Sequence, residues 1–163
     1  MVLRSSLFLS SLFLVGDDSF YVRCKMIDGG LRKIFRKHLP KFHWLSVETG
    51  LTEQGVPDSN FCIDGREGWV EFKLTSANKV PLRSEQIGWL LRRSRAGGRT
   101  YIAVRYRHSG GPRRGPPRDA LYIYPGAAAR LLALQGLSYG PLAAFEGGPG
   151  RWPWDRVREL IKN

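Results

Sequence analysis

The sequence predicts an α/β protein in which a small mixed β-sheet is flanked by helices. Apolar residues cluster on both sides of the turn signal Asp64-Gly65, which is the pattern of a β-hairpin. A helical pattern precedes this hairpin, and a second helical pattern followed by an alternating strand comes after it. Helices interleaved with strands are typical of sheets that are covered on their faces. The hairpin is the segment around which we expect the rest of the chain to be organised.

The first predicted helix covers residues 31–39 and ends at Pro40, which cannot continue it. Its apolar residues recur at helical spacing: Leu31, Ile34, Phe35 and Leu39. Basic residues surround this stripe, either as a solvated face or as direct contacts to phosphate. A strand is predicted next, over residues 42–47.

The hairpin itself has limbs at residues 59–63 and 69–73. Side chains in a strand point to alternate faces, so Val70 and Phe72 share one face and Glu71 and Lys73 share the other. The apolar pair can enter the core. The charged pair then stands together on the opposite face, within reach of an acidic residue on the preceding limb.

The chain after the hairpin continues the alternation of helix and strand. Ser84 is the expected N-cap of a helix that ends at Gly97-Gly98 and buries an inward stripe. A strand over residues 100–107 follows, and residues 109–118 form a loop rich in Gly, Pro and Arg. This loop is either a mobile basic arm that meets a nucleic-acid backbone or a hairpin tip without function.

The last part of the chain completes the prediction with an extension that is mainly helical. A short strand is expected over residues 121–124 and a helix over 127–134. The glycine-rich segment 147–150 lacks the Gly-Lys-Ser/Thr end of a phosphate-binding loop, so it is interpreted as a linker. The tryptophans at the start of the C-terminal helix, Trp152 and Trp154, are expected to anchor it to the core.

Length and composition limit the possible functions. The 163 residues suffice for one domain with a real core, and we expect it to span residues 26–163. The formal net charge of +12 favours a polyanionic partner, DNA or RNA. The two cysteines form no disulfide framework or zinc pattern.

Residues 1–25 have a different character from the rest of the chain. The apolar run 7–15 follows Arg4 and resembles the core of a signal peptide, but it is too short to span a membrane. No small-x-small cleavage site follows it, and Met26 offers an alternative start of translation. We expect a dispensable or non-native leader rather than a secretion signal, and a cytoplasmic protein.

The residues of the hairpin suggest a particular chemistry. Two carboxylates converging from neighbouring strands provide hard oxygen ligands that suit Mg²⁺ or Mn²⁺. A lysine two positions after the second carboxylate can orient a metal-bound water or neutralise a developing phosphorane. Asp58, Glu71 and Lys73 are the candidates for these roles, and the reaction that they suggest is hydrolysis of a phosphodiester.

The motifs Pro57-Asp58 and Glu71-Phe72-Lys73 resemble the signature of the PD-(D/E)XK nuclease superfamily. The order of the predicted elements over residues 28–107 is similar to the αβββαβ core of restriction-endonuclease-like folds. The Gly55-to-Asp58 segment, the Glu71-to-Lys73 motif and the helix with Glu85-Gln86 are most similar to small stand-alone phage nucleases. These are akin to the VRR-NUC and Holliday-junction-resolvase-like groups, although the Val-Arg-Arg signature of the former is absent.

This resemblance implies a metal-dependent DNA endonuclease, with branched or junction DNA as a candidate substrate. Asp58 and Glu71 would hold Mg²⁺, for which Mn²⁺ would substitute, and the main-chain carbonyl of Phe72 would be an extra ligand. Lys73 would position the attacking water, and Gln86 would orient the phosphate or Lys73. The superfamily often has a further acid ahead of the Pro-Asp motif. Glu48 is the candidate here, and Glu53 is its competitor.

The expected partner is DNA, with no membrane and no small-molecule cofactor. Resolution of a four-way junction requires two sites in a symmetric arrangement, so a homodimer is a candidate assembly. The expected DNA-binding residues lie on the second helix, on the strand after it and in the basic loop: Arg92, Arg93, Arg105, Arg107, Arg113 and Arg114. The alternatives are a noncatalytic basic protein that binds DNA or RNA and a degenerate nuclease fold that serves as a scaffold.

Overall fold

The computed structural model describes residues 28–47 and 54–163, and within these ranges it contains a sheet of six strands in the order β1-β2-β3-β4-β5-β6. The strands are β1 (His43–Ser46), β2 (Ser59–Ile63), β3 (Arg66–Thr75), β4 (Arg99–His108), β5 (Arg118–Pro125) and β6 (Ala143–Glu146). The α-helices are α2 (Leu31–His38), α3 (Ser84–Arg95), α4 (Ala129–Gln135) and α5 (Trp154–Lys162). Short 3₁₀ turns, η1 (Gly126–Ala128) and η2 (Gly136–Ser138), flank α4.

The sheet is mixed because one of its pairs is parallel. Strands β1, β2 and β3 form an antiparallel meander, and β4, β5 and β6 form another. The two meanders are joined by the parallel pair β3–β4, and α3 makes the connection between these strands. The order α2-β1-β2-β3-α3-β4 is the predicted αβββαβ core, so the predicted fold class is confirmed.

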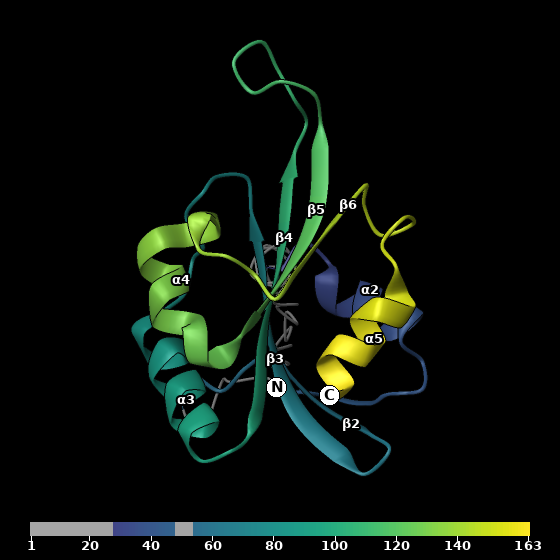
Figure 1. The fold of residues 1–163 in the computed structure, drawn as a ribbon, viewed down its shortest axis with the longest axis vertical. Coiled ribbons are helices and arrows are strands. Elements are labelled where there is room, and N and C mark those ends of the chain that lie inside the picture. Colours follow the sequence, from purple (N-terminus) through teal and green to yellow (C-terminus); the bar gives the residue numbers. More distant parts are fainter. Residues whose placement is uncertain (1–27, 48–53) are drawn as a thin grey trace, which may run out of the picture.

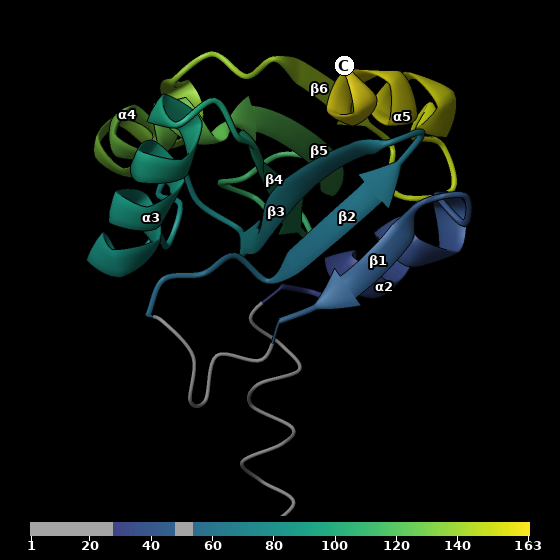
Figure 2. The same ribbon diagram turned by 90° about the horizontal axis from the view of Figure 1, so that it is seen from below.

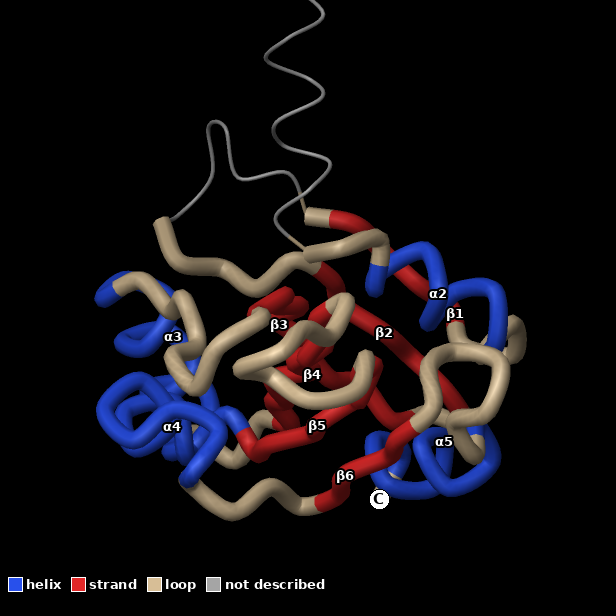
Figure 3. Tube along the Cα trace, turned by 90° about the horizontal axis from the view of Figure 1, so that it is seen from above, coloured by secondary structure: helices blue, strands red, loops and turns tan. Residues whose placement is uncertain are grey.

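Helices cover both faces of this sheet, as Figure 1 shows with the sheet nearly edge-on. Helices α3 and α4 lie on one face, and α2 and α5 lie on the other; the view from above in Figure 3 shows the same division. Each face has its own apolar core, because side chains of the central strands alternate between the two. In β4, for example, Ile102 and Val104 belong to the core under α3 and α4, whereas Tyr101 and Ala103 belong to the core under α2 and α5.

The turn of the hairpin between β2 and β3 follows directly from its two residues. Asp64 and Gly65 both have a positive φ, 49° and 72°. Positive φ at both central positions defines the type I′ turn, whose twist matches that of antiparallel strands. The turn fixes the register in which Ser59 lies opposite Val70, at the far end of the hairpin. The predicted β-hairpin is therefore confirmed, and its register determines where the next residue, Asp58, is placed.

The structure differs from the prediction in two details. Helix α3 begins at Ser84 itself with Arg83 as its N-cap residue, so Ser84 is not the cap. The C-terminal extension adds strand as well as helix, because residues 143–146 pair with β5 as β6. The connection 109–117 is built on an internal turn in which the Gly111 N–H donates to the Gly115 carbonyl. This connection projects beyond the helices (Figure 1).

Within the described ranges, none of the helices is long and apolar enough to cross a membrane. Residues 1–25, for which we expect a leader, lie outside the described residues.

Candidate active site

Glu71 and Lys73 lie in the middle of β3, on the face that α3 covers. Both are buried, with Glu71 0% and Lys73 4% exposed. The Lys73 Nζ atom is 2.7 Å from Glu71 Oε1, so the two side chains form a buried ion pair. Charged side chains are rarely buried to this degree unless they are paired or serve a function. The predicted pairing of these two side chains on one face of the strand is confirmed.

Asp58 immediately precedes β2 and reaches across to β3. Its Oδ2 atom accepts a hydrogen bond of 2.8 Å from the main-chain N–H of Phe72, the residue between Glu71 and Lys73. Strand β2 begins only at Ser59, opposite Val70, so the Asp58 carboxylate replaces the main-chain partner that Phe72 would otherwise have. Asp58 and Glu71 are therefore brought together at the open end of the β2–β3 ladder, as the sequence predicted.

Gln86 connects the first turn of α3 to this cluster. Its Oε1 atom accepts a hydrogen bond of 3.1 Å from the N–H of Arg83, which satisfies a donor at the start of the helix. Its Nε2 atom donates to Glu71 Oε1 at 2.5 Å. The bond to Arg83 fixes the orientation of the amide, because the oxygen is already used at the helix end. The amide nitrogen is thus directed at the carboxylate.

The segment before Asp58 is held against the same helix end by a close approach at Gly55. Gly55 has a φ of +88°, and a Cβ atom built on it would lie 2.3 Å from the Glu85 carbonyl oxygen. No other residue type fits this position without a shift of one backbone or the other. Gly55 therefore sets the distance between the Pro57-Asp58 segment and the start of α3, and this role was missed by sequence reasoning.

Burial raises the pKa of both carboxyl groups, and the charge of Asp58 raises the pKa of Glu71 further. The pKa of Glu71 is raised from 4.5 to about 7, first by burial and then by the nearby charge of Asp58, with Lys73 acting in the opposite direction. Burial also raises the pKa of Asp58, and the hydrogen bond from Phe72 and the charges of Lys73 and Arg32 oppose this shift. Two carboxyl groups that resist ionisation side by side are the electrostatic environment that a bound cation relieves.

The residues present fit a hard divalent cation. The second carboxylate oxygen of Glu71, Oε2, is buried and has no hydrogen-bond partner among the described residues. Because the N–H and C=O of one strand residue point the same way, we expect the Phe72 carbonyl to face the side on which its N–H meets Asp58. Carboxylate and carbonyl oxygens are the donors that Mg²⁺ and Mn²⁺ prefer.

A third acidic ligand is not part of the described structure. Residues 28–47 and 54–163 contain no group of three or more His, Cys, Asp or Glu side chains arranged to hold a metal ion. Glu48 and its competitor Glu53, the sequence candidates for this position, lie outside the described residues. Asp58 and Glu71 are the two acidic members of the described site.

The predicted DNA-binding arginines differ in their surroundings. Arg105 is a correction: it is 7% exposed, and its guanidinium is bound to both carboxylate oxygens of Asp119 at 2.8 and 2.6 Å. It also lies over the ring of Trp152, so it serves the core and is not available to a phosphate. The remaining arginines of the prediction are exposed: Arg92, Arg93, Arg107, Arg113 and Arg114.

Comparisons with known proteins give one structural likeness. The sequence matches no protein-family model and no curated protein. Among solved structures, the fold is similar to that of Hjc, a Holliday junction resolvase from the archaeal hyperthermophile Archaeoglobus fulgidus. The TM-score is 0.39 and the sequence identity 16%, over 76% of this chain and 88% of that one. The likeness is too distant to assign a family, so the functional assignment rests on the side chains of the site.

Proposed function

We propose that this protein is a metal-dependent nuclease of the PD-(D/E)XK type that hydrolyses phosphodiester bonds in DNA. The observation that carries the proposal is the buried carboxylate of Glu71. One of its oxygens is held by Lys73 and Gln86, and the other has no partner among the described residues. A buried oxygen without a partner is costly, and it is retained where a ligand or ion uses it.

Each side chain of the cluster has a distinct task in this proposal. Asp58 and Glu71 supply the anionic oxygens that hold the ion, with the Phe72 carbonyl beside them. Lys73 has three N–H donors, one of which is engaged by Glu71, so the others can orient the attacking water or receive charge from the phosphate. Gln86 keeps the Glu71 carboxylate in place through its amide nitrogen. When bound, a divalent ion would lower the pKa of its water and polarise the phosphate.

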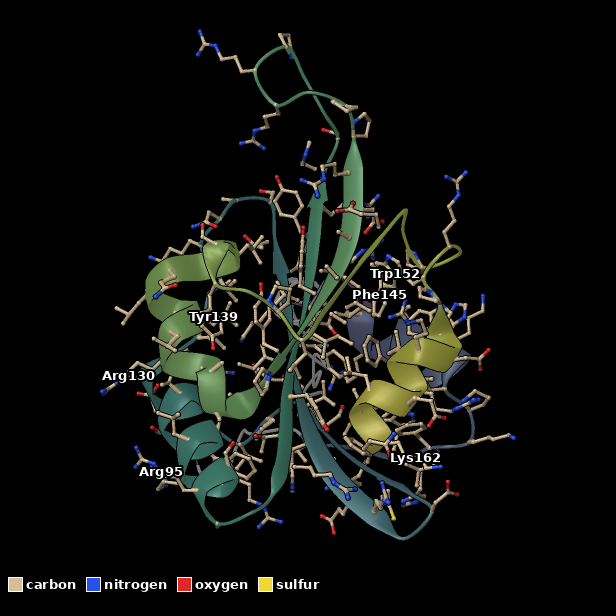
Figure 4. The ribbon with its side chains drawn as sticks, in the orientation of Figure 1. Arg95, Arg130, Tyr139, Phe145, Trp152 and Lys162 are labelled. Carbon is tan, nitrogen blue, oxygen red and sulfur yellow. The ribbon has the colours of Figure 1, made fainter. Side chains whose placement is uncertain are left out.

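The surface around the site suits a DNA backbone. The net charge of +12 favours a polyanion. Lys73 lies opposite Val104 in the parallel pair β3–β4, and Arg107 follows Val104 by three residues. This separation is about 10 Å along the strand, and the alternation of side chains places Arg107 on the other face of the sheet from Lys73. The loop with Arg113 and Arg114 extends farther in the same direction, and Figure 4 shows long side chains at its tip. The proposed role of these arginines is to bind backbone phosphates that lie at a distance from the cleaved bond.

The test is cleavage of supercoiled and branched DNA in the presence of Mg²⁺ or Mn²⁺. We expect Asp58→Asn, Glu71→Gln and Lys73→Met each to lose at least about a hundredfold in rate, the scale on which single electrostatic groups act in catalysis. The matched control is Glu159→Gln, which makes the same change on α5 at the opposite face of the sheet. It should cleave at the wild-type rate.

Two results would refute the proposal. Cleavage by the wild-type protein in excess chelator would exclude the role of the metal. Full activity of the Glu71→Gln variant would exclude the role of the site. If DNA is bound but never cut, with every divalent ion tried, the protein is a noncatalytic nucleic-acid-binding protein, and its charge accounts for the binding.

A further inference from the structure

We propose that Trp69 and Trp89 form a stacking surface for an unpaired nucleotide next to the phosphate that is cleaved. The inference rests on the proposed nuclease function, and it specifies the substrate as DNA that carries single-stranded nucleotides at the cut. The two tryptophans are named here as the tryptophan pair. Their rings contact each other with centroids 5.2 Å apart and planes at 62°.

The tryptophan pair directly adjoins the catalytic cluster on both elements that build it. Trp69 precedes Glu71 by two residues, so the two side chains point to the same face of β3 about 7 Å apart. Trp89 follows Gln86 by three residues, so it lies one turn farther along the same side of α3. A nucleotide whose phosphate lies at Glu71 would therefore place its base or a neighbouring base at the tryptophan pair.

The burial of Trp69 sets it apart from a core residue. Both tryptophans are half-buried, and Trp89 packs at the margin of the core under α3. Neither core cluster of the described residues includes Trp69. Its indole N–H is sheltered from solvent and has no hydrogen-bond partner in the described parts of the chain. Buried indole donors usually have a partner, so the unpartnered N–H of Trp69 is unusual for a residue that only packs in the fold.

The chemistry of the surroundings favours a nucleic acid with unpaired bases. Aromatic faces stack bases of any sequence, but a base inside a duplex is already stacked and paired, so only an unpaired one can reach such a ring. Arg93 follows Trp89 by four residues and is exposed, so a positive charge comes next on this side of the helix. The cleaved phosphate would thus lie at the cluster and the unpaired base at the tryptophan pair. The next phosphate would lie at Arg93.

The experiment measures binding without cleavage, in excess chelator, so that it does not depend on catalysis. The probes are a fluorescent blunt duplex and the same duplex with a single-stranded tail. We expect Trp69→Leu and Trp89→Leu to bind the tailed DNA about tenfold more weakly than the wild type, with little change for the blunt duplex, since one stacked base contributes on this scale. Trp69→Phe and Trp89→Phe keep a ring and should retain most of the affinity.

The control for the loss of a tryptophan is Trp154→Leu, on the opposite face of the sheet, where the ring stacks on His38. It should leave the difference between the two DNAs unchanged. A second readout is 2-aminopurine in the tail, whose fluorescence should be quenched by the wild type and not by Trp69→Leu. Equal losses on both DNAs, or no loss, would overturn the inference and leave the nuclease proposal standing. Failure of the wild type to bind either DNA would overturn both.

Discussion

The Glu71 carboxyl group should make the metal-free protein less stable as the pH rises from about 4.5 to about 7. Its pKa is raised to about 7 in the fold, against 4.5 in its ordinary surroundings. Between these values the folded protein keeps a proton that the unfolded chain has already released. Stability therefore falls with pH across this interval and is level above it. Each pH unit is worth up to about 1.36 kcal/mol, so the total loss due to this group is about 3 kcal/mol.

Urea denaturation in excess chelator, followed by tryptophan fluorescence, measures this loss. The free energy of unfolding is determined at several pH values for the wild type and for Glu71→Gln, which cannot titrate at this position. The difference between the two proteins removes the contributions of all other groups that titrate alike in both. Between pH 4.5 and pH 7.5, we expect the free energy of unfolding of Glu71→Gln to rise by about 3 kcal/mol relative to that of the wild type. The constant offset due to the altered contact with Lys73 does not affect this slope.

The control is Glu159→Gln, which makes the same substitution on α5, outside the site. A difference between wild type and Glu71→Gln that is independent of pH would refute the reasoning, because Glu71 would then titrate alike in the folded and unfolded chains. If the wild type instead became more stable relative to Glu71→Gln as the pH rises, the effect of Lys73 on the pKa of Glu71 would outweigh burial and the charge of Asp58.

Three further predictions follow from individual contacts. Gly55→Ala would place a Cβ atom against the Glu85 carbonyl oxygen. We expect the free energy of unfolding, measured by thermal denaturation, to fall by about 2 kcal/mol and Mn²⁺ binding to weaken. An unchanged melting temperature would contradict the close approach. Asp119→Ala leaves the buried guanidinium of Arg105 without its carboxylate partner. It should cost about 3 to 5 kcal/mol of stability, and a change below about 1 kcal/mol would show that the pair is dispensable. Replacing Arg113 and Arg114 together by alanine should weaken binding of all DNA sequences and lower the salt slope of log K by about 2; an unchanged slope would exclude the loop from the interface.

The parts of the site that depend on local sequence were predictable. The type I′ turn requires two residues that tolerate positive φ, and Asp64-Gly65 supplies them. Once the turn is fixed, strand alternation places Glu71 and Lys73 on one face, and the register brings Asp58 opposite them. Gln86 was predicted from its place in the first turn of the helix, although the hydrogen bond from Arg83 that orients its amide was not.

The parts that depend on distant segments were not predictable. Arg105 alternates with apolar residues in β4, which suggests an exposed arginine, but both faces of this strand are covered, and Asp119 on β5 provides a buried partner. The contact between Gly55 and Glu85 joins segments thirty residues apart, and a single glycine in a loop has no signal that reveals it. Strand β6 contains two alanines and becomes a strand by pairing with β5 and burying Phe145. Phe145 and Trp152 lie on the side of the sheet that faces α5 (Figure 4).

The edge of the sheet formed by β1 lies farthest from β6, and the view from below in Figure 2 shows α2 beside β1. The cluster of Asp58, Glu71, Lys73 and Gln86 lies on the face of the sheet that α3 covers, at the boundary between the two meanders. Asp58 comes from the first meander, and Gln86 comes from the helix that leads to the second. The site therefore depends on the junction between the two halves of the sheet.

The double use of Gln86 has a consequence for how this junction opens. The amide oxygen of Gln86 closes the first turn of α3 and its nitrogen restrains the Glu71 carboxylate, so we expect fraying of that turn and release of the carboxylate to be coupled. Exchange of the Arg83 amide hydrogen with deuterium should therefore report whether Glu71 is held. A ligand that draws the carboxylate away from Gln86 would accelerate exchange at this one position, at a distance from the ligand itself.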